Sequence, residues 1–219
     1  MFFKLLNDED VKFCLDHLPK DKTYEDGKNT GVNKQNTESN SVPDEVKKLI
    51  SSRFYDSFYI DSVYCPNRVS INFYNKYKSG DYYDLHIDSF RASPKSNNVY
   101  FDYGWSICLQ DEYEGGEFIV ETPIGQVGKK LAAGEAIIFP IIYPHGVKEV
   151  TKGVRHNIVG WMSSCASYES SFILKNIVEV GDFLEKLNSE QAKMIKVKIE
   201  LIRNYLHKEW GQRKWIMLN

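Results

Sequence analysis

The stretch YYDLHIDSF, residues 82–90, sets a histidine and an aspartate one residue apart among aromatic and apolar neighbours. Side chains two positions apart point to the same side of a β-strand. If the stretch is a strand, His86 and Asp88 project into one space. Both groups bind metals, but two ligands do not complete a metal site, so a third has to come from elsewhere.

The region around this stretch, residues 58–163, places apolar residues at every second position. In RVSINFY (68–74), for example, the apolar residues Val69, Ile71 and Phe73 alternate with Ser70, Asn72 and Tyr74. About eight short strands in about one hundred residues predict a β-sandwich or jelly roll. Besides residues 68–74, strands are predicted at 82–88, 103–109, 117–122, 126–131, 135–139, 146–150 and 154–162.

The flanks of this β region show the 3.6-residue pattern of helices. A first helix is predicted at 8–18 and a second from Pro43. The tail, 182–210, is helical, and we expect it to pack back on the sheet. Residues 24–41 are polar, rich in Asn and without periodicity, which predicts a loop that is either a lid or disordered.

These patterns predict a mainly β protein, with a double-stranded β-helix (jelly-roll) core and flanking N- and C-terminal α-helices. We expect the core at 58–165. The N-terminal helices and a mobile loop would occupy 1–57, and a C-terminal helical segment packed on the core would occupy 166–219.

Composition excludes several classes of protein. The 219 residues are 42% hydrophobic and 14% aromatic, which is globular usage. A net charge of −2 offers no electrostatic footprint for nucleic acid or anionic lipid. No apolar run approaches the roughly 18 residues of a membrane span, and the acidic start does not resemble a signal peptide. Four scattered cysteines without a C-x-x-C favour a reducing cytoplasm over a disulfide framework.

The third ligand is sought among five histidines. His17 and His207 fall on predicted helices near the ends of the chain. His145 follows the apolar run IIFPIIYP and opens a predicted strand, which a jelly roll can bring opposite His86. Two histidines and one carboxylate leave three positions of an octahedron open, an arrangement suited to non-haem Fe(II).

Arg155 follows ten residues after His145, on an otherwise apolar predicted strand. A buried guanidinium requires an anionic partner, and its shape suits a bidentate grip on a carboxylate. The far carboxylate of an iron-chelating dicarboxylate would be one partner. An internal salt bridge to Glu149 or Glu135 is the alternative. His156 points to the other face of the same strand, so we do not expect it to be a ligand.

The order His-x-Asp, distal His and Arg ten residues later resembles the Fe(II)/2-oxoglutarate-dependent dioxygenases. Within them the chain is similar to the prolyl 4-hydroxylase-like group, and most of all to the bacterial PKHD-type hydroxylases. The resemblance covers most of the chain. It rests on three segments: FYNKYKSGDYYDLHID (73–88), DEYEGGEFIVETPIGQVGKKLAAGEAIIFP (111–140) and HGVKEVTKGVRHNIVGWMSS (145–164).

The resemblance implies an iron site and a cosubstrate site. His86, Asp88 and His145 would hold Fe(II), and Arg155 would pair with 2-oxoglutarate. A tyrosine near the first ligands commonly shares that carboxylate. Its best match here is Tyr77, with Tyr74 the weaker one, while Cys108 stands where some relatives have a further tyrosine. Relatives use O₂ as oxidant and ascorbate to keep iron reduced. An aspartate at position 88 favours hydroxylation over halogenation.

Three function classes stay open on the sequence. The first is a hydroxylase of a prolyl residue in a peptide or protein, and the second a hydroxylase of a free amino acid or other small molecule. The third is a metal-binding jelly-roll module without turnover, which Arg155 disfavours. A zinc hydrolase is a remote fourth, because no general base accompanies the ligands. The oligomeric state is not predicted.

Residues around the site are assigned less directly. Segment 89–102 follows the first ligands, and we expect it to form a rim of the substrate site. Trp105 and Trp161 fit core aromatic positions better than a pocket lining.

Overall fold

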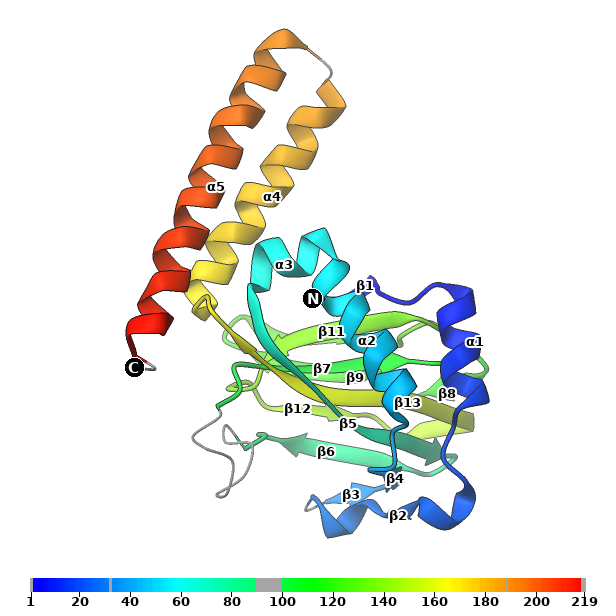
Figure 1. The fold of residues 1–219 in the computed structure, drawn as a ribbon. Coiled ribbons are helices and arrows are strands. Elements are labelled where there is room, and N and C mark those ends of the chain that lie inside the picture. Colours follow the sequence, from blue (N-terminus) through cyan, green and yellow to red (C-terminus); the bar gives the residue numbers. More distant parts are fainter. Residues whose placement is uncertain (1, 32, 90–99, 188, 218–219) are drawn as a thin grey trace. The chain divides into compact units, whose positions relative to one another are not determined.

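The computed structural model describes residues 2–31, 33–89, 100–187 and 189–217. The chain forms two compact units: one comprises residues 1–53 and 69–162, the other residues 54–68 and 163–219. The first unit carries both sheets of the fold, and the second is mainly helical (Figure 1).

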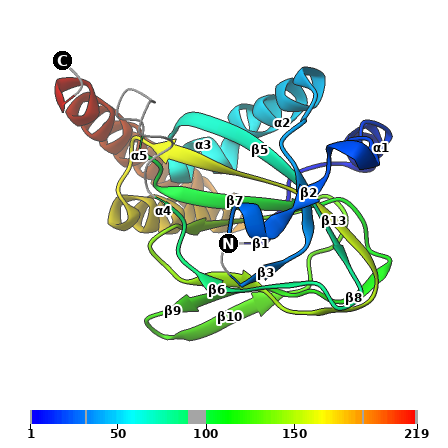
Figure 2. The same ribbon diagram turned by 90° about the horizontal axis from the view of Figure 1, so that it is seen from below.

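Two sheets face each other in the first unit, which Figure 2 shows as two layers. The larger sheet has the order β1 (Phe2–Lys4), β11 (Glu135–Pro140), β7 (Tyr103–Cys108), β13 (Val150–Ser164), β5 (Pro66–Lys78), β4 (Thr37–Ser39) and β2 (Glu25–Asp26), and β8 (Tyr113–Gly115) pairs with β13. The smaller sheet has the order β10 (Gly125–Lys129), β9 (Phe118–Thr122), β12 (His145–Val147), β6 (Tyr82–His86) and β3 (Lys34–Gln35). The predicted mainly β jelly-roll class is confirmed.

The core between the layers follows from alternation along the strands. On β9, Phe118 and Val120 are buried while Ile119 is only partly covered. Each such side chain contributes about 1.5–3 kcal/mol when fully buried. The cluster draws on strands of both sheets and comprises Tyr77, Cys108, Tyr113, Phe118, Val120, Leu131, Ile137, Phe139, Val147 and Val150.

The N-terminal helices match the sequence prediction closely. α1 (Asp8–Asp16) begins at a capping box formed by Asn7 and Asp10, which satisfies backbone N–H groups of the first turn. Arg53 on α2 (Asp44–Asp56) donates two hydrogen bonds of 2.8 Å to the Asp10 carboxylate. The Tyr74 hydroxyl of β5 donates to the Cys14 carbonyl at 3.1 Å, which ties α1 to the larger sheet.

The prediction of a loop without secondary structure at 24–41 is wrong. This segment contains β2, the short 3₁₀ helix η2 (Gly27–Asn29), β3 and β4, after η1 at Asp21–Thr23. β4 pairs with β5 of the larger sheet and β3 with β6 of the smaller one. The segment therefore adds β4 and β2 to the larger sheet and β3 to the smaller one. These strands are two or three residues long, so no periodicity could announce them.

The second unit contains α3 (Phe58–Tyr64), α4 (Tyr168–Leu187) and α5 (Glu190–Met217). Two boundaries differ from the predictions. Residues 58–64, predicted within the β region, form a helix capped by Ser57, and the helical tail begins at 168 rather than 182. Packing of the tail on the sheet, and the domain boundaries 57/58 and 165/166, stay predictions. No helix among residues 2–31, 33–89, 100–187 and 189–217 is long and apolar enough to cross a membrane.

Gly115 is required where β8 meets β13. Its φ of +70° lies in the left-handed region, and an added Cβ would lie 2.3 Å from the Glu149 carbonyl oxygen. Gly80 has a φ of +88° but nothing within 4 Å of an added Cβ.

We expect Gly115→Ala to lower the free energy of unfolding more than Gly80→Ala does. The backbone conformation costs both variants about 1–3 kcal/mol, but only Gly115→Ala also pushes against backbone. Urea unfolding of both variants measures the difference. Equal losses would show that the β8–β13 contact yields without cost.

Candidate metal centre and cosubstrate pocket

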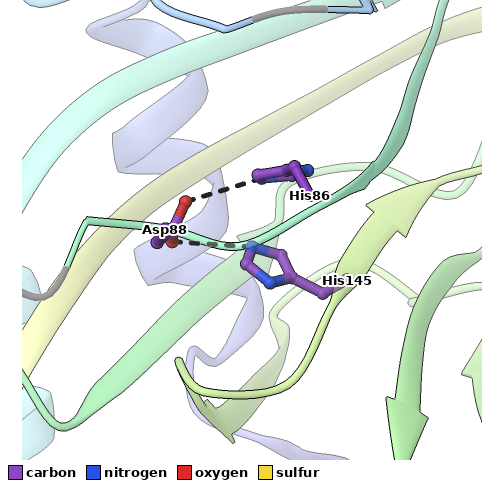
Figure 3. A group of neighbouring side chains, drawn as sticks. All are labelled: His86, Asp88 and His145. Carbon is purple, nitrogen blue, oxygen red and sulfur yellow. Dashed lines mark ion pairs between the residues drawn. The ribbon is translucent and has the colours of Figure 1, made fainter.

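Three predicted ligands lie together at one end of the β6–β12 pair (Figure 3). His86 is the last residue of β6 and His145 the first of β12, and antiparallel register sets them directly opposite each other. Asp88 lies two residues beyond the end of β6. One ligand atom from each of the three residues lies within 4.8 Å of the others. This is the only such His, Cys, Asp or Glu group among the residues with described positions.

Both imidazoles have their Nδ1 atoms committed to backbone carbonyls. His86 Nδ1 lies 2.9 Å from the Asp84 oxygen and His145 Nδ1 lies 3.1 Å from the Tyr143 oxygen. A carbonyl can only accept, so Nδ1–H donates in each ring. Nε2 is then the nitrogen left for a metal. Both Nε2 atoms lie 3.5 Å from an Asp88 carboxylate oxygen, and all three groups point toward one another.

Asp88 is held as a carboxylate. Burial opposes its charge, but interactions with His145 and His86 and a hydrogen bond from Trp161 outweigh burial and hold the pKa of this carboxyl below its ordinary value. The Trp161 indole Nε1–H donates to Oδ2 at 2.7 Å. An ionised, oriented carboxylate is the form that binds a metal ion.

A cavity of about 120 Å³ adjoins the three ligands. One wall comes from the strands of the larger sheet and another from β6, β9 and β12, while β3 and β4 supply the edge. Its lining includes the three ligands together with Lys34, Glu38, Phe73, Asn75, Tyr77, Tyr83, Trp105, Ser106, Phe118, Phe139, Asn157, Val159 and Trp161.

Arg155 is fully buried in the middle of β13. Its Nη1–H donates to Asn157 Oδ1 at 2.7 Å, and Asn157 in turn donates to Ser106 Oγ at 3.0 Å. Among the described residues, Nε and Nη2 have no hydrogen-bond partner, and the guanidinium makes no ion pair. A buried cation without a counter-charge is energetically expensive.

The alternative internal partners of Arg155 are not in contact with it. Glu135 pairs with Lys129 at 2.6 Å and accepts from the Ala132 N–H, and Glu149 forms no ion pair in the described part of the chain.

The two candidate tyrosines lie in different places. Tyr77 is buried, lines the cavity and has its ring centroid 5.3 Å from Arg155 Cζ. Burial raises the pKa of Tyr77, and the guanidinium only partly offsets this, so the hydroxyl stays protonated and can donate a hydrogen bond. Tyr74 faces α1 instead, where it bonds the Cys14 carbonyl.

The side chain of Cys108 lies beside a buried tyrosine, Tyr113. The Tyr113 hydroxyl donates to the Leu131 carbonyl at 2.8 Å and lies 3.7 Å from Cys108 Sγ. Burial raises the pKa of Tyr113, while the positive charge of Arg155 acts in the opposite direction. Sequence reasoning missed Tyr113.

Trp105 and Trp161 were expected to be core aromatics rather than pocket lining. Trp105 is buried in the core but also lines the cavity, and Trp161 lines the cavity and bonds Asp88. A signal was available for Trp161. It lies six residues after Arg155 on one strand, and an even spacing puts both on the same face. The same rule keeps His156 out of the ligand group.

The two other histidines discussed above lie away from the three ligands, and most of the expected substrate rim is not among the described residues. His17 caps the end of α1, and His207 bonds the Ser62 carbonyl in the second unit. Residues 90–99 of the expected substrate rim lie outside the described residues.

Comparison with known proteins gives a consistent result. Residues 70–163 match the family described as the 2OG-Fe(II) oxygenase superfamily. A PKHD-type hydroxylase of Prochlorococcus marinus (strain MIT 9312) is 34% identical over 173 residues, covering 74% of this chain and 76% of the relative. Another from P. marinus (strain MIT 9301) is 31% identical, covering 75% and 78%.

Solved structures show the same fold. A Trichoplax adhaerens prolyl hydroxylase, in complex with a hypoxia inducible factor peptide fragment, superposes with a TM-score of 0.57 at 17% identity, covering 75% of this chain and 83% of the other. A Pseudomonas putida prolyl-4-hydroxylase gives a TM-score of 0.54 at 14% identity, covering 75% and 91%.

The fold and the matched family define a 2-oxoglutarate-dependent Fe(II) dioxygenase. More narrowly, the chain belongs to the PKHD-type hydroxylases. Both the resemblance and the enzyme class predicted from the sequence are thereby confirmed.

We expect Trp161→Phe to raise the dissociation constant for Fe(II) by about tenfold, the lower range for loss of a group that orients a metal ligand. The variant keeps an aromatic ring at this position but loses the N–H donor to Asp88, together with the five-membered ring that carries it. Anaerobic titration calorimetry measures the constant. His156→Ala is the control and should bind as the wild type does. Wild-type affinity in Trp161→Phe would show that Asp88 is oriented without the indole.

Proposed function

We propose that His86, Asp88 and His145 hold the Fe(II) of this dioxygenase and that Arg155 holds its 2-oxoglutarate. The donor set fits the metal, because two imidazole nitrogens and one carboxylate on one face are the ligands that non-haem Fe(II) oxygenases use. The buried guanidinium of Arg155, whose Nε and Nη2 have no hydrogen-bond partner among the described residues, fits the cosubstrate. That guanidinium is the observation that carries the proposal.

The chain's own residues have distinct tasks in this reaction. Asp88 and the two imidazoles would supply three ligands to the iron, which would leave its remaining coordination positions to the cosubstrate and O₂. Arg155 offers Nε–H and Nη2–H to a carboxylate, and the Tyr77 hydroxyl is available to the same group. Bound iron and 2-oxoglutarate would supply the oxidation, in which O₂ is consumed, succinate and CO₂ form, and the substrate gains a hydroxyl group.

We propose a prolyl residue of a peptide or protein as the substrate. Two solved structures that share this fold are prolyl hydroxylases, and one of them is in complex with a peptide fragment. Beside Asp88 an aromatic group suits an apolar ring: Phe73 meets Trp161 edge-on at 6.3 Å, and Phe101 stacks on Trp161 at 5.9 Å between centroids. A free amino acid or other small molecule is the alternative substrate.

Two further conditions belong to the proposal. Ascorbate is proposed as the reductant that keeps the iron ferrous, and it belongs in the assay. The cytoplasm is proposed as the compartment, because the four cysteines of the chain are free thiols.

We expect Arg155→Ala to raise the KM for 2-oxoglutarate at least tenfold while the affinity for Fe(II) alone stays unchanged, because Arg155 is not a metal ligand. Succinate formation measures the first quantity and anaerobic calorimetry the second. Arg155→Lys keeps the charge but not the fork of donors, so an intermediate KM is expected. An unchanged KM in Arg155→Ala would remove the cosubstrate role.

The substrate class is tested by turnover with Fe(II), 2-oxoglutarate and ascorbate. We expect a proline-rich peptide to stimulate succinate formation several-fold and to gain 16 mass units, and free L-proline to do neither. Asp88→Ala should form no succinate above background, which controls for uncoupled chemistry of free iron. Stimulation by free proline alone would favour the small-molecule alternative.

A further inference from the structure

A buried ion pair lies in the segment that joins the two sheets. Lys34 on β3 and Glu38 on β4 have side chains only 8% and 4% exposed, and their charged ends meet. Both residues line the cavity beside the proposed metal centre. The mechanism above uses neither of them.

The pair is completed by Thr30. Its hydroxyl donates to the second Glu38 oxygen, and the Lys34 ammonium lies 3.2 Å from the same hydroxyl oxygen. The cluster is therefore neutral overall and internally bonded. Burying such a pair is seldom more stable than burying apolar side chains of similar volume, so stability alone does not account for it.

The Lys34 ammonium has a third neighbour, the ring of Tyr83. Nζ lies over this ring, 4.9 Å from its centroid, at a cation–π distance. The Tyr83 ring also stacks on the His86 imidazole, with centroids 3.6 Å apart and planes inclined by 12°. A continuous series of contacts thus runs from Glu38 through Lys34 and Tyr83 to His86.

We propose that Lys34 and Glu38 are positioning residues for His86, acting through Tyr83. This inference rests on the proposed iron site. Rotation of the His86 ring would break both its stack on Tyr83 and its bond to the Asp84 carbonyl, so a fixed Tyr83 keeps Nε2 directed at the metal position. Lys34 fixes Tyr83 through the ring face.

Glu38 has a second effect in this arrangement. A lone ammonium near the centre would repel a divalent cation, and the Glu38 carboxylate cancels that charge. Lys34 can then hold the tyrosine ring without weakening metal binding. Glu38→Gln should therefore weaken Fe(II) binding, although its amide keeps a hydrogen-bond acceptor for Lys34.

The test is a double-mutant cycle on full-length protein, with Fe(II) alone as the probe under anaerobic conditions. We expect Lys34→Met and Tyr83→Leu each to raise the dissociation constant about tenfold. The double variant should be no weaker than Tyr83→Leu, because Lys34 acts through the ring. Lys34→Arg keeps the cation and should bind as the wild type does.

A readout without metal separates positioning from a purely structural role. In the metal-free protein, the imidazole ¹⁵N shifts of His86 should report one fixed tautomer in the wild type and an averaged one in Tyr83→Leu and Lys34→Met. A pair that only anchors the strands would lower the unfolding midpoint and leave these shifts and the Fe(II) affinity unchanged, which would overturn the proposal. Fully additive losses in the cycle would also overturn it.

Failure of the iron site itself would look different. If wild-type protein binds no Fe(II) at one equivalent, both this inference and the proposed metal ligands are wrong. If the wild type binds and the Lys34 and Tyr83 variants bind equally well, only the positioning role fails. Should Tyr83→Leu not fold, Lys34→Met against Lys34→Arg decides the question alone.

Discussion

The site depends on one interaction, the antiparallel pairing of β6 with β12. This pairing alone sets His86 opposite His145, although 59 residues separate them in the sequence. It also requires a very close approach of backbones, because a Cβ on Gly146 would lie 2.6 Å from the Tyr83 carbonyl oxygen. Any side chain at position 146 would force the strands apart and move both imidazoles.

Two buried cationic side chains, Lys34 and Arg155, differ in how their charge is compensated. Lys34 meets its counter-charge, Glu38, within the chain, and the result is neutral and complete. Arg155 has no anionic partner among the described residues, and two of its nitrogens are unbonded. The first cation belongs to the scaffold of the site. The second carries an electrostatic cost. Under the proposed cosubstrate role an incoming dicarboxylate would remove this cost, so binding of the cosubstrate would stabilise the folded chain.

The candidate site was largely predictable because strand periodicity is short and strict. Strand periodicity predicted that Arg155 and His156 lie on opposite faces of one strand. With a jelly roll assumed, His86 and His145 were expected to lie close together. Asp88 was predicted to lie on the same strand as His86. Instead β6 ends at His86, and Asp88 lies in the irregular segment that follows.

The segment 24–41 was beyond sequence reasoning for a physical reason. Its strands have two or three residues, and they exist because β5 and β6 offer unpaired backbone groups to them. Asn36, for example, is fixed by a side-chain bond of 3.2 Å to Asn75, 39 residues away. Local composition contains no trace of such partners. The helix at 58–64 was missed for another reason. The predicted period-two region of the strands begins at residue 58, before β5 actually starts.

The same segment has a consequence for solubility. An open sheet edge is a template for another chain, and natural proteins blunt such edges with very short, charged strands. Here one stretch of chain closes the β5 edge of one sheet and the β6 edge of the other, and its outermost strand, Glu25–Asp26, ends in two exposed carboxylates. Negative charge at that rim repels a second copy of itself. The segment therefore guards the protein against edge-to-edge aggregation while it shapes the cavity wall.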